Sequence, residues 1–208
     1  MKDKSILILK IEKAFKDYFD GGLNFTSQSN FCYVVQGTEY AINRFDIPSE
    51  RVKVKHWYSD IWIYVKIQFQ AQREKGKDCI LLPFVSISFF QKNGGDVNQM
   101  FRAEWDSFIG EASHPQPHWH ITSNLALEKA LEDLQNPQNE HDEANIFADL
   151  FSSEKKDLLN IHSMHFAMAG SWIKDGKMVS SLSNDEQIID WMKYLFEHVH
   201  TEIDYITG

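Results

Sequence analysis

Hydrophobic and polar residues change their spacing about halfway along the chain. Between residues 31 and 122 they alternate, as in 61–69, where isoleucine, valine or phenylalanine occupies every odd position. Successive side chains of a strand point to opposite faces, so this period of two predicts strands that bury one face. The alternation recurs in 85–89 and 101–105. The sequence Asn-Gly-Gly-Asp at 93–96 predicts a hairpin turn between these two strands, because glycine readily adopts a positive φ.

The two ends of the chain follow the helical period of 3.6 instead. Apolar residues in 4–19 have this spacing, and the sequence Asp-Gly-Gly at 20–22 is typical of a helix end. The same spacing predicts further helices over 124–135, 154–173 and 184–206.

Strands followed by helices predict an α+β fold. We expect an antiparallel sheet of about five to seven strands (residues 31–122), preceded by one N-terminal helix and followed by three to four C-terminal helices packed on it. A chain of 208 residues, 43% of them hydrophobic, is long enough to bury a core as a single domain. Residues 1–208 are therefore expected to form one α+β domain, with the helix and sheet in 1–122 and an acidic helical part in 123–208.

Cysteine content and hydropathy predict a cytoplasmic protein. No apolar run approaches the 18 residues that a membrane-spanning helix needs. Cys32 and Cys79 lie far apart in the sequence, and a chain of this size needs no disulfide, so we expect both thiols to be reduced.

Charge is unevenly distributed along the chain, whose net charge is −9. Residues 1–104 carry 15 basic and 12 acidic side chains, whereas residues 105–208 carry 6 basic and 18 acidic ones. General nucleic-acid binding requires a basic surface, so this composition argues against it. Two halves of opposite sign favour a protein partner or a homo-oligomer.

Histidine is the residue type that most strongly indicates a site. His118 and His120 follow two prolines that come after His114, and residues i and i+2 of a strand point to the same side. His162 and His165 have the i, i+3 spacing that places two side chains on one helix face. If the two groups meet, neutral imidazoles at this spacing could bind a divalent transition metal, zinc first among them.

Three polar residues, Arg102, Glu104 and Asp106, are expected to share one face of their strand. If that strand pairs with the strand at 117–122, one sheet face would carry an arginine, two carboxylates and two imidazoles. These three residues are the candidate catalytic groups, with Arg102 holding an anionic substrate. The alternative is an ordinary solvated face with weak cross-strand ion pairs.

Two other interpretations of the histidines stay open. They could form a buried hydrogen-bond network at the junction of sheet and helices, or a recognition surface together with Trp119. Separately, the aromatic residues Trp57, Tyr58, Trp62 and Tyr64 are a candidate partner surface unless a helix covers them.

Two short segments resemble elements of known families. His120-Ile121-Thr122 resembles the H-x-T element of the two-histidine phosphoesterases, and His118-Trp119-His120 resembles the H-x-H of cupins. The chain has neither the second H-x-T nor the further cupin elements, and we assign no family. Glycine-rich nucleotide-binding motifs are also absent from the sequence.

Two functions follow from these features. The first is an accessory or binding subunit of a bacterial cytosolic protein assembly, with a His-rich polar pocket at the junction of sheet and helices. The alternative is a metal-dependent hydrolase that acts on a phosphoester or a related anion through the same histidines and acids.

Overall fold

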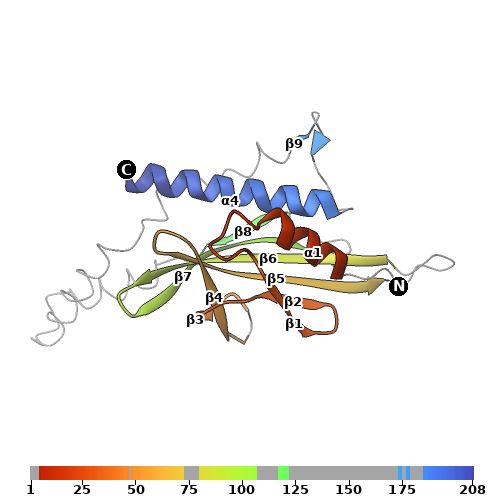
Figure 1. The fold of residues 1–208 in the computed structure, drawn as a ribbon, viewed down its shortest axis with the longest axis horizontal. Helices are drawn as coiled ribbons and strands as arrows, with labels where there is room; N and C mark the ends of the chain where they lie inside the picture. The colour runs from red at the N-terminus through yellow and green to blue at the C-terminus, as the bar shows by residue number, and fades with distance from the viewer. Residues whose placement is uncertain are drawn as a thin grey trace, which may run out of the picture.

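The computed structural model describes residues 5–46, 48–72, 80–106, 117–121, 173–174, 177–178 and 185–208. Figure 1 shows a strongly curved sheet with two helices on one side of it. In chain order the elements are α1 (Ser5–Ala14), β1 (Phe25–Ser29), β2 (Cys32–Val35), β3 (Glu39–Asn43), β4 (Glu50–Tyr58), β5 (Ile61–Gln72), β6 (Ile80–Asn93), β7 (Asp96–Asp106), β8 (His118–Ile121), β9 (Ile173–Lys174), β10 (Lys177–Met178) and α4 (Asp185–Thr207).

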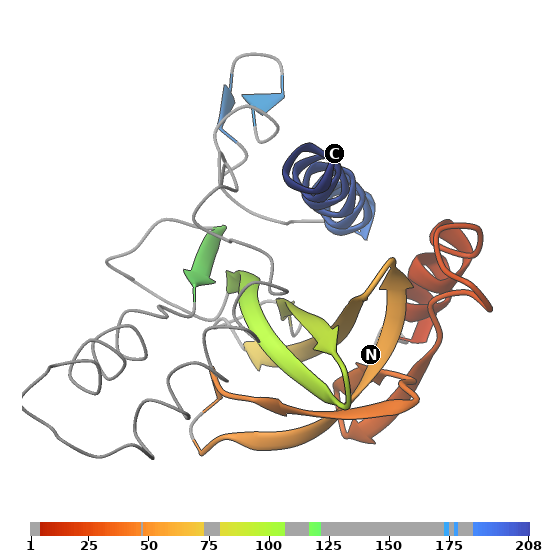
Figure 2. The ribbon, with the colours of Figure 1, turned by 90° about the vertical axis from the view of Figure 1, so that its left-hand side faces the viewer.

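The main sheet has eight strands, and every described pairing is antiparallel. Its order is β1-β2-β5-β6-β7-β8, with β4 also paired to β5 and β3 paired to β4. One edge of β5 thus serves two strands: β4 pairs near Ile61 and Ile63, and β2 pairs near Ile67 and Gln68. The β3–β4 hairpin consequently leaves the sheet at one end of β5 and curves away from β2 (Figure 2).

The odd-numbered residues of β5 and β6 face α1 and α4, as the alternation predicted. Phe89 of β6 lies 5.9 Å from Phe196 of α4, and Trp105 of β7 lies 6.3 Å from Trp191, measured between ring centroids. The apolar stripe of α4 is buried against this face, as its helical spacing predicted, and consists of Ile188, Trp191, Met192, Leu195, Phe196, Val199 and Ile203. Aromatic side chains bury the most apolar area per residue, so this layer is the main core of the domain.

The opposite face of the sheet is also buried, although no described helix covers it. Tyr64 and Ser88, which pair across β5 and β6, are 3% and 0% exposed. The β3–β4 hairpin curves over this face and joins β7 through side chains: Gln99 donates to Asn43 Oδ1 at 2.8 Å and accepts from the backbone N–H of Arg44 at 2.6 Å. The sheet therefore encloses a second, more polar interior.

The structure corrects the predicted fold. The prediction of five to seven strands within 31–122 and three to four C-terminal helices is wrong: the sheet has eight strands, begins at Phe25, and is followed by one helix within the described residues. The first strand was missed because only one of its five residues is buried, so it shows no apolar alternation. The helices expected over 124–135 and most of 154–173 lie outside the described residues.

The predicted β6–β7 turn is confirmed: Gly94 has a φ of +58°, and Asn93 pairs with Asp96 across it. The helix predicted over 4–19 ends earlier, at Ala14, and Gly21 and Gly22, with φ values of +70° and +71°, follow it in the turns that lead to β1. Neither helix in the described part of the chain has an apolar stretch that could cross a lipid bilayer.

Gly37 lies where the chain passes from β2 to β3 directly against β4. A Cβ atom at this position would lie 2.5 Å from the carbonyl oxygens of Lys53 and Val54. The adjacent Thr38 donates its backbone N–H to Val54 at 2.9 Å, so the two backbones are held together here. Glycine at this position lets the β3–β4 hairpin approach its own sheet.

We expect Gly37→Ala to lower the free energy of unfolding by about 2 kcal/mol, because the methyl group would force two hydrogen-bonded backbones apart. Urea denaturation followed by circular dichroism measures this change. Gly95→Ala is the matched control, since no heavy atom lies within 4 Å of its Cβ position and its φ is not positive. Equal stability of the two variants would contradict the close approach.

Candidate metal centre

The pairing of β7 with β8 assembles the candidate site. Glu104 lies opposite His118 and Arg102 opposite His120, so these four side chains share one face of the sheet. The alternate residue Trp119 points to the other face, where its ring lies 5.6 Å from Phe101. The expected pairing of the Arg102–Asp106 strand with the strand containing His118 and His120 is confirmed.

The site lies on the face of the sheet turned away from α1 and α4. Trp119, next to both histidines in sequence, is on the helix side, 6.5 Å from His198 of α4. The alternation of β8 therefore points His118 and His120 in the opposite direction. The sequence interpretation placed a pocket at the junction of sheet and helices, whereas these two side chains lie in the polar interior.

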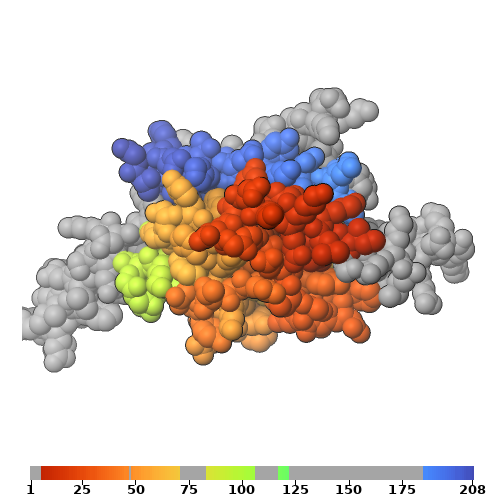
Figure 3. All heavy atoms as spheres, viewed as in Figure 1, coloured from red at the N-terminus to blue at the C-terminus, as the bar shows by residue number. Residues whose placement is uncertain are grey.

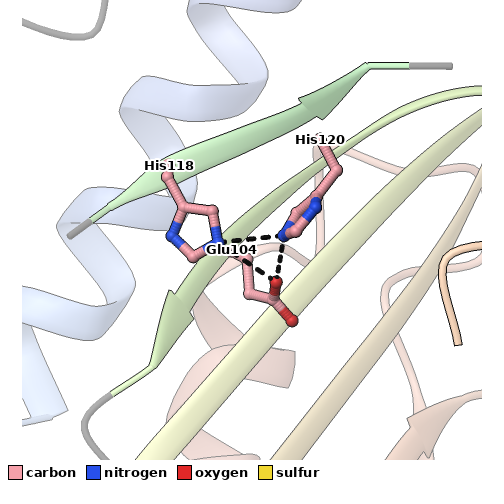
Figure 4. Close-up of side chains that lie close together, drawn as sticks. All are labelled: Glu104, His118 and His120. Carbon is pink, nitrogen blue, oxygen red and sulfur yellow. Dashed lines mark hydrogen bonds and ion pairs between the residues drawn. The ribbon is translucent and has the colours of Figure 1, made fainter. Parts of the chain in front are cut away.

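Three possible ligand atoms converge in this interior (Figure 4). His120 Nε2 lies 2.6 Å from Glu104 Oε2, His118 Nε2 lies 3.4 Å from the same oxygen, and the two Nε2 atoms are 2.9 Å apart. The three residues form a group that could hold a metal ion. Both imidazoles present their Nε2 atoms to the carboxylate oxygen.

Such an arrangement requires either an N–H donor or a cation among the three atoms. An ionised carboxylate only accepts hydrogen bonds, and a neutral imidazole has one N–H and one lone pair. If both Nε2 atoms were deprotonated, two lone pairs and a carboxylate oxygen would face one another without a donor. An N–H on either Nε2 atom or a metal ion removes this repulsion, so the same geometry suits a hydrogen-bonded cluster and a metal centre.

The spacing of the three atoms fits a transition metal after small adjustments. Ligands about 2.0–2.1 Å from a tetrahedral zinc ion are about 3.3 Å apart, and octahedral ligands are closer, about 2.9 Å. The observed separations of 2.6, 2.9 and 3.4 Å span these values. The Glu104 side chain is 8% exposed, while those of His118 and His120 are 20% and 35% exposed, so the histidine side of the cluster is the more open one.

Buried charges hold the Glu104 carboxylate in place. Arg102 donates from one terminal nitrogen to Glu104 Oε2 at 3.1 Å and from the other to Asp46 Oδ1 at 2.8 Å. Asp46 also accepts a hydrogen bond from Asn43 at 2.9 Å and lies 3.7 Å from Lys66 Nζ. Positive and negative groups therefore alternate from Lys66 to the histidines.

The environment of Arg102 assigns it a positioning role. Its side chain is 7% exposed, both terminal nitrogens bind carboxylates, and its guanidinium carbon lies 5.3 Å from the centre of the Phe45 ring. Phe45 also contacts His120, with ring centroids 5.6 Å apart. Both terminal nitrogens are already used to fix Glu104 and Asp46, so the geometry does not support the expected role of Arg102 in holding an anionic substrate.

The remaining predicted site residues are placed as follows. His114, His162 and His165 lie outside the described residues. The backbone of Asp106 is described as the last residue of β7, opposite Phe84. The side chain of Asp106 lies outside what the structure describes. Among the described residues, the candidate metal centre thus consists of His118, His120 and Glu104.

The predicted partner surface divides between the two faces of the sheet. Tyr64 is 3% exposed and lies in the polar interior, where burial above all raises the pKa of its hydroxyl. Trp62 is partly buried, with the Lys92 ammonium 5.3 Å from its ring centre. Trp57 and Tyr58 are on the helix side, where the Tyr58 hydroxyl donates to Asp204 at 2.7 Å. These four residues therefore do not form one continuous surface.

Sequence analysis missed Asp46 and Lys66, which extend the charge chain. The sequence indicated the position of Lys66 only weakly: it is an even-numbered residue of β5, like Tyr64, and therefore lies on the same inner face of the sheet. No sequence pattern indicated Asp46: it lies after β3, and only the fold of the β3–β4 hairpin brings it to Arg102, 56 residues away.

We expect Asp46→Ala to lower the free energy of unfolding by about 2 kcal/mol, because it leaves a buried guanidinium with one carboxylate fewer. Glu39→Ala is the control. Its ion pair with Lys92 is also short, 3.1 Å, but the two side chains are 43% and 32% exposed, and its loss should cost less than about 1 kcal/mol. Chemical denaturation of both variants measures the difference. If Glu39→Ala were as costly as Asp46→Ala, the buried chain would have no special importance for stability.

Comparison with known proteins finds no counterpart of this arrangement. No protein-family model, curated protein or solved structure matches the chain. The geometry of Glu104, His118 and His120 is therefore the basis for any assignment of function.

Proposed function

We propose that this protein is a metal-dependent hydrolase whose zinc ion is held by Glu104, His118 and His120. The single observation that supports this proposal is the convergence of one carboxylate oxygen and two imidazole nitrogens within 3.4 Å of one another. Zinc is the ion of choice because two neutral imidazoles and one carboxylate are a common ligand set for catalytic zinc.

The chemistry of the proposed site follows from its ligand count. Three protein ligands leave a coordination position open, where zinc supplies an activated water and polarises a substrate oxygen. The partial exposure of His118 and His120 favours access for that water from their side. A phosphoester or a related anion suits a site whose ion carries more positive charge than its one carboxylate neutralises.

The residues behind the ligands support the same role. Arg102 binds Glu104 Oε2, the oxygen that also faces both histidines, and so directs this carboxylate toward the proposed ion. The groups that orient metal ligands in this way raise the affinity for the ion. We expect Arg102 to act through Glu104 and not through contact with the substrate.

A second candidate function is a binding subunit of a protein assembly. The cavity beside Trp57 and Tyr58, on the helix side of the sheet, favours it, because aromatic side chains are enriched in recognition sites. This function does not require the metal centre, and the two are compatible in one chain.

Elemental analysis of protein prepared without a histidine tag tests the proposed metal centre. We expect about one equivalent of zinc in the native protein, and at least a tenfold loss of zinc affinity in His118→Ala, His120→Ala and Glu104→Gln. His56→Ala is the control, because the His56 side chain is exposed and its Nε2 contacts the Ser59 carbonyl oxygen. Less than half an equivalent of any transition metal, with no uptake from added zinc, would eliminate the site.

Activity is tested with the zinc-loaded protein and bis(p-nitrophenyl) phosphate as a generic phosphodiester. We expect zinc-dependent release of nitrophenolate that His56→Ala retains and that the three ligand variants lose by at least about a hundredfold, as expected when an essential metal ligand is removed. Stoichiometric zinc without hydrolysis would contradict phosphodiesterase activity while leaving the metal centre intact.

A further inference from the structure

A second candidate site lies on the helix side of the sheet, whereas the proposed metal centre lies on the opposite face. The two sites also differ in chemistry. A cavity of 360 Å³ opens where three segments meet: the turn after α1, the end of β4 and the C-terminal half of α4. The N-terminal segment, the β4–β5 region and α4 adjoin on the face shown in Figure 3. This volume is at the lower end of the range found for small-molecule sites, about 300–1,000 Å³.

The walls of the cavity are mostly aromatic. Tyr18, Trp57, Tyr58 and Phe196 line it together with the imidazole of His200. The Trp57 and Phe196 rings are 5.1 Å apart, and those of Tyr58 and His200 are 4.1 Å apart, so neighbouring rings hold one another in place. The faces of aromatic rings carry negative electrostatic potential, which attracts cations.

Two carboxylates add negative charge: Glu197 lines the cavity, and Asp204 is hydrogen-bonded to the lining residue Tyr58. Tyr18 donates its hydroxyl to Glu197 at 2.9 Å, and Tyr58 donates to Asp204 at 2.7 Å. These hydrogen bonds, more than burial, raise the pKa of both tyrosines, so the phenols stay neutral and keep their donors on the carboxylates. The described lining residues include no lysine or arginine that would neutralise this charge.

The hydrogen bonds also indicate which cation fits. Glu197 and Asp204 already accept hydrogen bonds from the hydroxyl groups of Tyr18 and Tyr58. Asp204 also lies 3.5 Å from His200 Nδ1. A ligand rich in N–H donors would therefore have to compete for these oxygens. A methylated ammonium group has few or no donors and spreads its charge over methyl groups, which pack against rings. Aromatic enclosures of this kind suit quaternary ammonium ions.

We propose that the cavity between Tyr18, Trp57, Tyr58 and α4 binds a methylated ammonium group. Free choline and the side chain of trimethyl-lysine carry the same head group, and both fit this chemistry. Attraction to the rings and to the two carboxylates provides the affinity, and the hydrocarbon parts of Trp57 and Phe196 exclude water from the methyl groups.

Calorimetric titration of the full chain with choline chloride tests the proposal. The control ligand is 3,3-dimethylbutan-1-ol, which has the shape of choline without its charge. We expect choline to bind at least tenfold more tightly than this alcohol, because charge and not shape is recognised. Equal affinity for the two compounds would overturn the proposal.

Two variants locate the binding in the cavity. Glu197→Gln removes one charge but keeps an acceptor for Tyr18, and Tyr18→Leu removes one ring; we expect each to weaken choline binding about five- to tenfold. Tyr194→Leu is the matched control, since Tyr194 is an exposed α4 tyrosine that does not line the cavity. Affinity that changes equally in all three variants, or in none, would contradict this location.

Trimethyl-lysine, added as the free amino acid, distinguishes the two sources of the head group. Tighter binding than choline would identify a modified side chain as the ligand, and weaker binding would identify a free small molecule. Either result supports the site. Failure of both head groups to bind would contradict it, whatever the zinc content of the protein.

Discussion

The buried ion pair between Arg102 and Glu104 is the interaction on which the inner face of the sheet depends. Removing either charge from water is costly unless the other lies beside it, and both side chains are less than 10% exposed. This constraint requires β7 to keep Arg102 and Glu104 on the same face. It also requires the β3–β4 hairpin to bring Asp46 to Arg102, and it leaves Glu104 Oε2 directed at the histidines. The convergence of Glu104, His118 and His120 is therefore a product of how the sheet satisfies its interior charges.

The two faces of the sheet differ in the kind of interaction that they provide. Large aromatic and aliphatic side chains between β5–β8 and the helices provide most of the apolar burial, which stabilises the domain without directional requirements. On the other face, polar residues such as Ser88 and Tyr64 are buried beside a charged network with strict geometry. Because the apolar core lies on one face and the polar network on the other, polar groups can be placed on the second face without weakening the main core.

Sequence reasoning succeeded where periodicity and turn residues agree. The strands around Ile61–Phe69 and Phe101–Trp105, the Gly94–Gly95 turn and the final helix all follow from local patterns. The shared face of Glu104, His118 and His120 follows from the strand period once β7 and β8 are paired. The first strand was harder because it is short and four of its five residues are exposed. The contribution of Asp46 depends on the path of a hairpin, which no local pattern encodes.

The position of α4 has a consequence for biosynthesis. The apolar face of the sheet is complete in sequence at Ile121, but the helix that covers it begins at Asp185. A ribosome that adds about 5–20 residues per second needs several seconds to synthesise the intervening chain. During that interval the nascent sheet presents Phe89, Phe101 and Trp105 without α4, a surface that chaperones recognise and that favours aggregation. The yield of folded protein should therefore respond to translation speed and to chaperone supply more strongly than its final stability would suggest.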